Sequence, residues 1–324
     1  MFQIGTNWQL WDLPKDFDEA ISGIGLRGYK REEPILLPAE FSRLRPLSVD
    51  DIASIYCPTR RDLFLLKKRR LQGSSTWGRI AGPLIEDFCM GLIDEYKNLF
   101  DGSSKESYDS IKNLMEDYSN RFITNKQDAL NKLKRYSTAP AEDVTNFVLV
   151  LQYTGRYELA MLGADWFLSS GTTPNNSLLA RVPIKHRNVQ ISPDARVIGI
   201  SSPSTPDFLI SSLRVVGDIK SGAAFKDFYP LTCAGYAIAY ENQYGSGNDM
   251  NFGIIYFLET HSRAITTARS YAFVIDDQLR HEFLDRRNEA FGILLQDTET
   301  PPPLASRDQY CIHCKYLNEC DKDR

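Results

Sequence analysis

The pattern of apolar and polar positions divides the chain into a helical half and a half rich in strands. Residues 105–170 read as helical throughout, and shorter helices are predicted near 48–56, from about 59, and over 78–100. Beyond residue 170 the pattern changes to short β-branched runs broken by Gly, Pro and Ser. The runs predicted to be strands are 180–192, 196–202, 206–212, 213–221, 251–259 and 269–275.

Two further helices are predicted among and after these strands, over 231–243 and 276–296. Helices, then strands with one helix between them, then a last helix predict an α/β fold with a mixed central sheet. The chain divides accordingly into an irregular N-terminal extension, a helical region, a core that carries the sheet, and a linker with a cysteine-containing tail. Their bounds are 1–46, 47–170, 171–298 and 299–324.

Local signals mark where the first helices begin and end. Ser48 and Asp51 have the spacing of a capping box, which predicts a helix start. The Cys57-Pro58 pair then breaks that helix. In the longer helix over 78–100, Pro83 is expected near the first turn or at a kink.

The charge of the chain gives a limited indication about its partners. A net charge of −4 over 324 residues disfavours a general nucleic-acid coat protein, but it allows a local basic groove. The segment from Thr59 to Arg70 is the candidate for that groove, and the alternative is a solvated helix face. Its basic residues, predicted to follow a DNA backbone, are Arg60, Arg61, Lys67, Lys68, Arg69 and Arg70.

The N-terminal residues show no basic leader followed by an apolar run, so no secretory signal is expected. Apolar runs such as 252–258 have the length of a strand and are too short to span a bilayer. We therefore predict a cytoplasmic protein that does not enter a membrane, in which disulfides are not expected.

Three of the six cysteines lie within ten residues of one another near the C-terminus, in a C-x2-C-x5-C pattern typical of a metal site. A tetrahedral site needs a fourth ligand, which is His313, water, or a distant residue. We favour Cys57, because it lies at a helix break beside basic residues that lower the pKa of a thiol. Cys89 and Cys233 read as small buried hydrophobic residues. Zinc, an iron–sulfur cluster and unligated thiols all remain compatible with the spacing.

A second constellation combines two carboxylates with a lysine. Asp218 and Lys220 are two positions apart on a predicted strand, so their side chains project from the same face. Asp207 opens the preceding strand, and a hairpin of this length brings it toward Asp218. Two carboxylates offer oxygen ligands to a divalent cation, and a lysine offsets negative charge on a phosphate. The alternative is a surface hairpin with an ion pair.

The joint order of these motifs resembles a known nuclease family. Pro206-Asp207, followed by Asp218-x-Lys220, matches the PD-(D/E)xK signature of metal-dependent nucleases with a restriction-endonuclease-like core. The helix opening "GRIAGPLIEDF" precedes it, and one cysteine upstream and three downstream frame it. This order resembles the RecB-like nucleases with an iron–sulfur cluster. The phrases "LSVDDIASIYCPTRRDLFLL" and "PLTCAGYAIAYE" make it most similar to the CRISPR-associated Cas-four family, in its longer archaeal-type branch.

The resemblance implies roles for particular residues. Asp207 and Asp218 are implied as ligands of Mg²⁺ or Mn²⁺, and Lys220 as the catalytic lysine. Tyr236 matches the tyrosine that, in the family, reaches toward the site or the DNA. The residues implied to hold an iron–sulfur cluster, usually 4Fe–4S in such proteins, are Cys57, Cys311, Cys314 and Cys320.

Two positions depart from the family pattern. The family carries a metal-binding histidine four residues after the glycine that matches Gly78, and this chain has Gly82 there. Glu86, one turn further on, faces the same way and is a candidate substitute ligand. The family's glutamine four residues before Tyr236 is Thr232 here, a weaker phosphate contact.

The resemblance implies a DNA exonuclease that processes DNA ends with single-stranded overhangs during CRISPR spacer acquisition, with the CRISPR integrase subunits as partners. Gly82 and Thr232 favour a second hypothesis, a DNA-binding subunit of the adaptation complex with little or no cleavage. A third hypothesis is a RecB-like repair nuclease that acts outside CRISPR.

Overall fold

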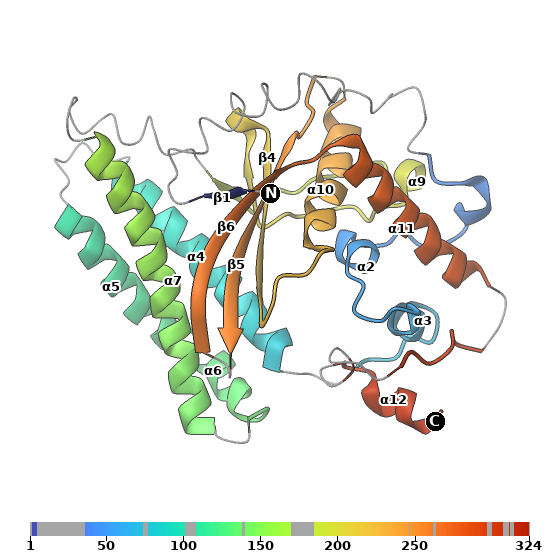
Figure 1. Cartoon of the computed structure of the whole chain (residues 1–324), viewed down its shortest axis with the longest axis horizontal. Helices are drawn as coiled ribbons and strands as arrows, with labels where there is room; N and C mark the ends of the chain where they lie inside the picture. The colour runs from blue at the N-terminus through green and yellow to red at the C-terminus, as the bar shows by residue number, and fades with distance from the viewer. Residues whose placement is uncertain are drawn as a thin grey trace.

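The computed structural model contains one mixed sheet between two groups of helices (Figure 1). It describes residues 2–4, 36–73, 77–100, 108–137, 140–169, 185–245, 247–261, 264–296, 300–306, 311 and 314–323. Six strands form the sheet in the order β1-β6-β5-β4-β3-β2. Their bounds are Phe2–Ile4 (β1), His186–Arg187 (β2), Phe208–Ile210 (β3), Val215–Gly222 (β4), Phe252–His261 (β5) and Ala264–Val274 (β6).

Strand β4 lies in the middle of the sheet and has neighbours of both directions. It pairs antiparallel with β3, placing Phe208 opposite Gly217, and parallel with β5, placing Asp218 opposite Ile255. A parallel pair needs a crossover, and helix α10 (Tyr229–Tyr244) supplies it between β4 and β5. The predicted α/β fold with a mixed central sheet is therefore confirmed.

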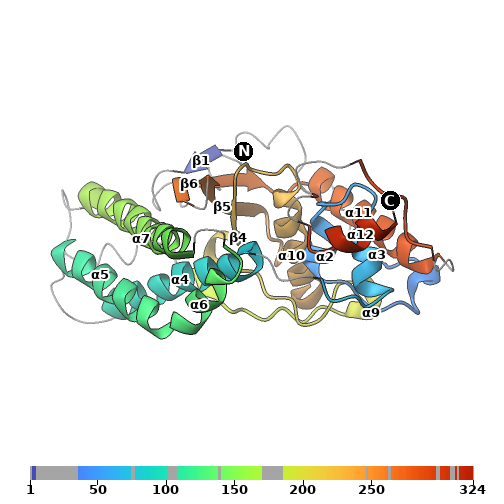
Figure 2. The same cartoon turned by 90° about the horizontal axis from the view of Figure 1, so that it is seen from below.

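Helices cover both faces of the sheet, as two perpendicular views show (Figures 1 and 2). One face packs on α10, α2 (Val49–Ala53) and α11 (Asp277–Leu295). The other face packs on the helical region predicted from the sequence. Its members are α4 (Trp77–Phe100), α5 (Tyr108–Asn125), α6 (Gln127–Lys134) and α7 (Pro140–Ser169).

Strand alternation assigns the side chains of β5 to these two cores. Ile255 and Phe257 lie in the core with α10, whereas Tyr256 and Leu258 lie in the core with α4 and α7. Both faces of β5 are buried, which is why its sequence is a continuous apolar run rather than an alternating one.

Two sequence predictions about secondary structure are corrected. Residues 196–202 were expected to form a strand, but Ala195–Ile198 form the short helix α9. The Asp194 side chain caps it by accepting from the amides of Arg196 and Val197, and this local cap outweighs the β-branched composition. Phe2–Ile4, which the sequence placed in an irregular extension, form an edge strand beside β6.

A buried ion pair joins α10, α11 and the segment before β5. Arg280 donates to Glu241 at 2.7 Å and to the carbonyl of Met250 at 2.9 Å, and Glu241 also accepts from the Met250 amide. Both side chains are buried, and each retains hydrogen-bond partners. This network fixes the crossover helix, and therefore the strands that carry the candidate site.

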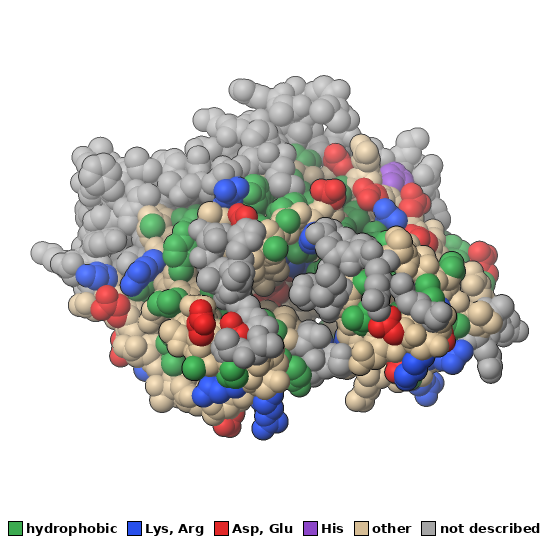
Figure 3. All heavy atoms as spheres, turned by 60° about the horizontal axis from the view of Figure 1, so that its bottom comes forward, with side chains coloured by type: hydrophobic (Ala, Val, Ile, Leu, Met, Phe, Trp, Pro, Cys, Tyr) green, Lys and Arg blue, Asp and Glu red, His purple; other side chains and the backbone are tan. Residues whose placement is uncertain are grey.

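On the face seen in Figure 3, the lysine and arginine side chains of the coloured residues are interspersed with acidic ones. None of the helices in the described part of the chain is both long and apolar enough to cross a membrane.

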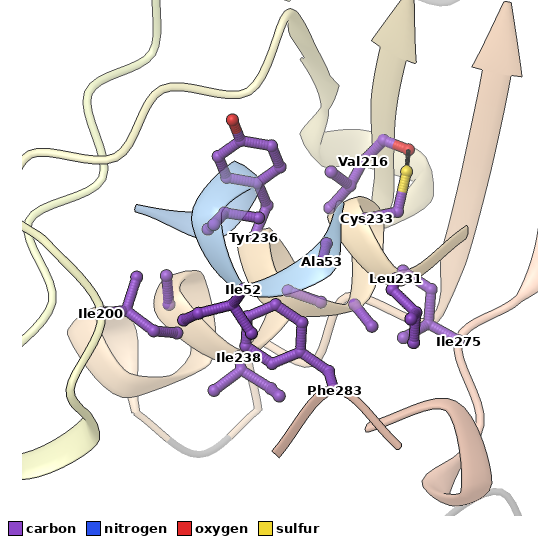
Figure 4. Close-up of a cluster of buried hydrophobic side chains, with 14 of the residues drawn as sticks. Ile52, Ala53, Ile200, Val216, Leu231, Cys233, Tyr236, Ile238, Ile275 and Phe283 are labelled. Atoms are coloured by element: carbon purple, nitrogen blue, oxygen red, sulfur yellow. Dashed lines mark hydrogen bonds between the residues drawn. The ribbon is translucent and has the colours of Figure 1, made fainter. Parts of the chain in front are cut away.

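Small residues of α10 allow close packing around the centre of the molecule (Figure 4). A side chain at Gly235 would lie 2.4 Å from a ring carbon of Phe283, so only glycine fits there. Cys233 is fully buried, with its thiol directed to the carbonyl of Val216, as the sequence predicted for a structural cysteine. The ring of Tyr236 lies beside α2, and its hydroxyl points away from the aliphatic side chains.

Candidate active site

The hairpin of β3 and β4 brings the predicted acids and lysine together. Asp207 directly precedes β3, and its carboxylate accepts a hydrogen bond of 2.5 Å from the backbone amide of Ile219 on β4. The pairing is close because the Phe208 ring covers Gly217, where a Cβ atom would lie 2.0 Å from the ring. Because Ile219 lies between Asp218 and Lys220 in the sequence, the hydrogen bond from its amide holds the Asp207 carboxylate next to both residues.

Asp218 is the centre of this arrangement and is only 3% exposed. Its Oδ2 atom accepts from the ammonium of Lys220 at 2.8 Å and from the hydroxyl of Thr232 at 2.6 Å. The prediction that Asp218 and Lys220 project from one face is therefore confirmed. Thr232 lies on α10, so the crossover helix also supports the carboxylate.

Asp50 is a neighbour of Lys220 that the sequence reasoning missed. One of its carboxylate oxygens lies 3.7 Å from the lysine nitrogen, and its side chain is 61% exposed. It lies in the first turn of α2, where Ser48 and Asp51 form the predicted capping box. An acid in the first turn of a helix is common, so nothing in the sequence indicated that the packing of α2 on α10 brings Asp50 to the lysine.

Negative charge is concentrated around this lysine. Burial raises the pKa of Asp207 well above its usual value, and the nearby Asp218 and Glu86 raise it further. Burial also raises the pKa of Glu86, with Asp87 and then Asp218 adding to the effect. The charges of at least three carboxylates therefore act on one another across β4 and α4, which is an arrangement that a bound cation would stabilise.

Lys220 remains charged in this environment. Burial alone would lower the pKa of its ammonium, but Asp218 and Asp50 outweigh burial and raise the pKa above its usual value. A permanently charged ammonium beside two carboxylates suits a group that binds a phosphate rather than one that accepts a proton.

Tyr236 lies four residues after Thr232, on the same face of α10. It is mostly buried, and burial raises the pKa of its hydroxyl, with Asp50, Asp218 and Asp207 acting in the same direction. The predicted tyrosine is therefore brought toward the acids, as a neutral hydroxyl.

The acids have the chemistry of a divalent-cation site but are not closed around one. In the described part of the chain, no three His, Cys, Asp or Glu side chains converge closely enough to hold a metal ion as they stand. The carboxylate of Asp207 accepts from an amide, and that of Asp218 accepts from Lys220 and Thr232. A cation would take over carboxylate oxygens that now accept these hydrogen bonds. A side chain at Gly82 would meet none of the described residues within 4 Å.

The raised pKa of Asp207 predicts how this residue affects the stability of the protein. We expect Asp207→Asn to raise the melting temperature of metal-free protein at neutral pH by about 2 °C or more. Since the folded-state pKa is raised, the wild type loses stability as pH rises from about 4 toward that pKa, whereas asparagine does not titrate. The gain should therefore grow with pH over this range, as measured by thermal unfolding in EDTA. Asp285→Asn, an exposed position on α11, is the control. A lower melting temperature for Asp207→Asn at pH 7 would contradict the interpretation.

The structure corrects the expectation that the whole basic segment faces solvent. Arg60 is 1% exposed and donates to the carbonyls of Asp51, Ile52 and Ser54, satisfying the end of α2. Arg61 is 4% exposed and donates to the carbonyl of Pro302 and to Asp323 in the tail. Both guanidinium groups donate to backbone carbonyl oxygens inside the protein, so they are not available to a DNA backbone.

The rest of the segment is also partly engaged. Lys67 forms a 2.6 Å ion pair with Asp51, and Lys68 donates to the carbonyl of Gln296. Arg69 and Arg70 are exposed beyond the end of α3 (Arg61–Lys67). These two arginines and Lys67, which is exposed although it is paired with Asp51, are the part of the predicted DNA contact that remains at the surface.

The cysteine-containing tail returns to the segment before α3, near the C-terminus in Figures 1 and 2. Burial raises the pKa of the Cys314 and Cys320 thiols, and each of these thiols also interacts electrostatically with that of Cys57. The Cys320 thiol interacts with that of Cys311 as well. The structure thus gathers the predicted cysteines in one region, although not as a closed metal site; His313 lies outside the described residues.

Packing independent of any metal also holds the tail. Tyr316 is buried against Phe64 and Leu65 of α3, and its hydroxyl donates to the carbonyl of Leu71 at 3.2 Å. Helix α12 (Leu317–Lys322) follows it, and Arg61 reaches Asp323 at its end. The last residues are therefore fixed beside α3, the helix that follows Cys57.

The fold and this site define an α/β protein with an acid–lysine centre on adjacent strands and a second, thiol-rich region. The sequence profile of the family described as CRISPR-associated exonuclease Csa1 matches residues 1–322. The chain belongs to this family of CRISPR-associated exonucleases, and the predicted resemblance to Cas-four-like CRISPR nucleases is confirmed. Comparison with curated proteins and with solved structures gave no match.

Proposed function

We propose that the chain is a divalent-metal-dependent phosphodiesterase that trims DNA ends before their integration as CRISPR spacers. Two independent lines support this. The family is one of CRISPR-associated exonucleases, which favours a CRISPR role over a repair nuclease outside CRISPR. The observation that carries the chemistry is the buried Asp218 in contact with Lys220, with Asp207 held on the neighbouring strand.

Three carboxylates are proposed to hold Mg²⁺ or Mn²⁺: Asp207, Asp218 and Glu86. When bound, the cation would polarise the phosphodiester and lower the pKa of its water. Asp218 is anchored by the hydroxyl of Thr232, which fixes the position of its carboxylate on β4. Glu86 lies on α4 one turn after Gly82, and its carboxylate interacts electrostatically with that of Asp218.

Lys220 is proposed to stabilise negative charge that develops on the phosphate. Its ammonium lies between Asp218 and Asp50, so it is held in one place before the substrate arrives. A fixed charge aimed at the developing negative charge lowers the barrier without a large rearrangement. Tyr236 would contribute a neutral hydroxyl toward the same acids.

The thiol-rich region is proposed to carry a 4Fe–4S cluster held by Cys57, Cys311, Cys314 and Cys320. The donor set suits iron–sulfur chemistry, and the electrostatic interactions among these thiols support their proximity. Because the ligands come from segments about 250 residues apart in the sequence, such a cluster would fasten the chain end to α3. The CRISPR integrase subunits are the proposed partners.

Metal dependence tests the proposal directly. Wild-type protein should shorten a 5′-labelled single-stranded DNA when Mg²⁺ or Mn²⁺ is added and should stop when EDTA is added. Asp207→Asn should bind the cation more weakly and show a higher metal concentration at half-maximal rate. Asp285→Asn is the matched control for the change of acid to amide. Cleavage that persists in EDTA, or that is identical in Asp207→Asn, would refute this assignment.

A second candidate function is a DNA-binding subunit of the adaptation complex with little cleavage. Two observations favour it: Gly82 replaces the expected histidine, and the acids are not closed around a cation. In that case the same DNA should bind without being shortened at any concentration of Mn²⁺.

A further inference from the structure

An exposed aromatic pair lies between two segments that are distant in sequence. Tyr56 is in the connection between α2 and α3, and 46% of its surface is exposed. Its ring meets that of Phe228 edge-on, with centroids 5.1 Å apart and an angle of 83° between the rings. Phe228 immediately precedes α10 and is partly buried. The pair therefore combines a solvent-exposed ring with a supported one.

Buried aromatic residues hold this pair in place. Tyr229 is buried and packs edge-on against both Phe228 and Phe225, each at 5.3 Å between centroids. The hydroxyl groups of Tyr56 and Tyr229 also interact with each other. The orientation of the exposed ring is thus set by the core, and little freedom would be lost when a ligand binds to it.

The pair also borders the acid–lysine centre. The hydroxyl of Thr232 lies 2.5 Å from the carbonyl of Tyr229 and 2.6 Å from the carboxylate of Asp218, so Tyr229 is one residue removed from the acids. The hydroxyl groups of Tyr56 and Tyr229 also interact electrostatically with the ammonium of Lys220. Lys220 is the residue that contacts Asp218 and Asp50. An exposed aromatic ring, a cation and a group of acids therefore lie next to one another on the protein.

We propose that Tyr56, supported by Phe228, is a stacking platform for an unpaired base of the DNA strand whose phosphate reaches Lys220. The inference rests on the proposed nuclease function and adds the residue that would recognise an unpaired base at a single-stranded or frayed end. Bases inside a duplex are stacked on both faces, whereas an unpaired base can turn a face toward a protein ring. The ammonium of Lys220 complements the phosphate, and the ring complements the base.

The internal use of Arg60 and Arg61 strengthens this assignment. Since these guanidinium groups bind carbonyls and the tail, the basic segment offers less charge to a DNA backbone than its composition predicts. Stacking contributes affinity that does not depend on such a charged track, at a point next to the reaction centre.

The test measures binding without added divalent cation, so that cleavage does not interfere. The probes are a single-stranded oligonucleotide with 2-aminopurine as its terminal base and a blunt duplex of the same sequence. Stacking of the terminal base should quench its fluorescence in the wild type. Tyr56→Leu should weaken single-strand binding about 5- to 100-fold and remove the quenching. Tyr56→Phe, which keeps the ring, should bind within about twofold of the wild type.

Tyr153→Leu, at an exposed tyrosine of α7, is the matched control and should behave as the wild type. Circular dichroism and iron content should be recorded for each variant. If Tyr56→Leu fails to fold, Phe228→Leu, the loss of the supporting ring, provides the same comparison, and wild-type quenching stands as an independent measurement.

Three results would overturn the platform: no quenching by the wild type, unchanged single-strand binding by Tyr56→Leu, or equal losses for Tyr56→Leu and Tyr56→Phe. An equal loss of duplex binding would also refute it, because the ring would then not select an unpaired base. A protein partner at Tyr56 would give the first two results. If the terminal base is quenched but no metal-dependent cleavage occurs, the nuclease proposal is refuted and the stacking proposal is retained. If cleavage occurs without quenching, the stacking proposal is refuted and the nuclease proposal is retained.

Discussion

Lys220→Ala is expected to reduce metal-dependent cleavage of single-stranded DNA about 100- to 1000-fold. The ammonium lies 2.8 Å from Asp218 and 3.7 Å from Asp50, so the wild-type charge is already fixed where the phosphate would bind. Removing it leaves the charge that develops on the phosphate without this stabilisation. Initial rates at saturating Mn²⁺, followed with a 5′-labelled strand, measure the effect.

Controls separate this role from a loss of folding. Lys132→Ala, at an exposed position on α6, should retain the wild-type rate. Lys220→Arg should recover only part of the rate, because the larger planar guanidinium does not reproduce the position of the ammonium between two carboxylates. Equal rates for the wild type and Lys220→Ala, with both proteins folded, would mean that catalysis does not occur at this centre.

Cys311→Ala is expected to remove iron from the protein and to release the tail from α3. A structural metal site contributes on the order of 10 kcal/mol to folding when its ligands are far apart in sequence. The packing of Tyr316 on α3 and the contact of Arg61 with Asp323 are much smaller contributions. Poor solubility, loss of visible absorption and a lower melting temperature should therefore occur together, measured on anaerobically purified protein with iron and sulfide analysis.

Cys89→Ala is the matched control for the change of thiol to methyl. Cys89 is buried in the core formed with α4, away from the tail, so this variant should keep its iron even if it loses some stability. A soluble Cys311→Ala protein with unchanged iron and unchanged melting would show that the thiols of the tail do not hold a cluster.

The features that depend on neighbouring residues could be predicted from the sequence. Asp218 and Lys220 share a face because side chains two apart on a strand point the same way. Asp207 reaches them because the short connection between β3 and β4 makes the two strands pair as an antiparallel hairpin, and the capping box of Ser48 and Asp51 forms within one turn. The local error, at 196–202, arose where the Asp194 cap outweighed the strand-like composition.

Features made by segments far apart in the sequence could not be predicted in the same way. Arg60 and Arg61 have the composition of a DNA contact, but folding surrounds them with carbonyl oxygens that only the tertiary structure brings there. Asp50 lies 170 positions before Lys220, and no local pattern indicates that α2 packs on α10 beside the lysine.

The sequence by itself singled out the residues proposed to carry the chemistry: the acids and the lysine of the hairpin, and the cysteines before α3 and in the tail. Only the tertiary structure decided which other side chains surround that lysine, which basic residues remain at the surface, and where an exposed ring borders the site. The reason is physical: strand alternation and helix caps follow from covalent neighbours, whereas burial and long-range electrostatics depend on how distant segments pack.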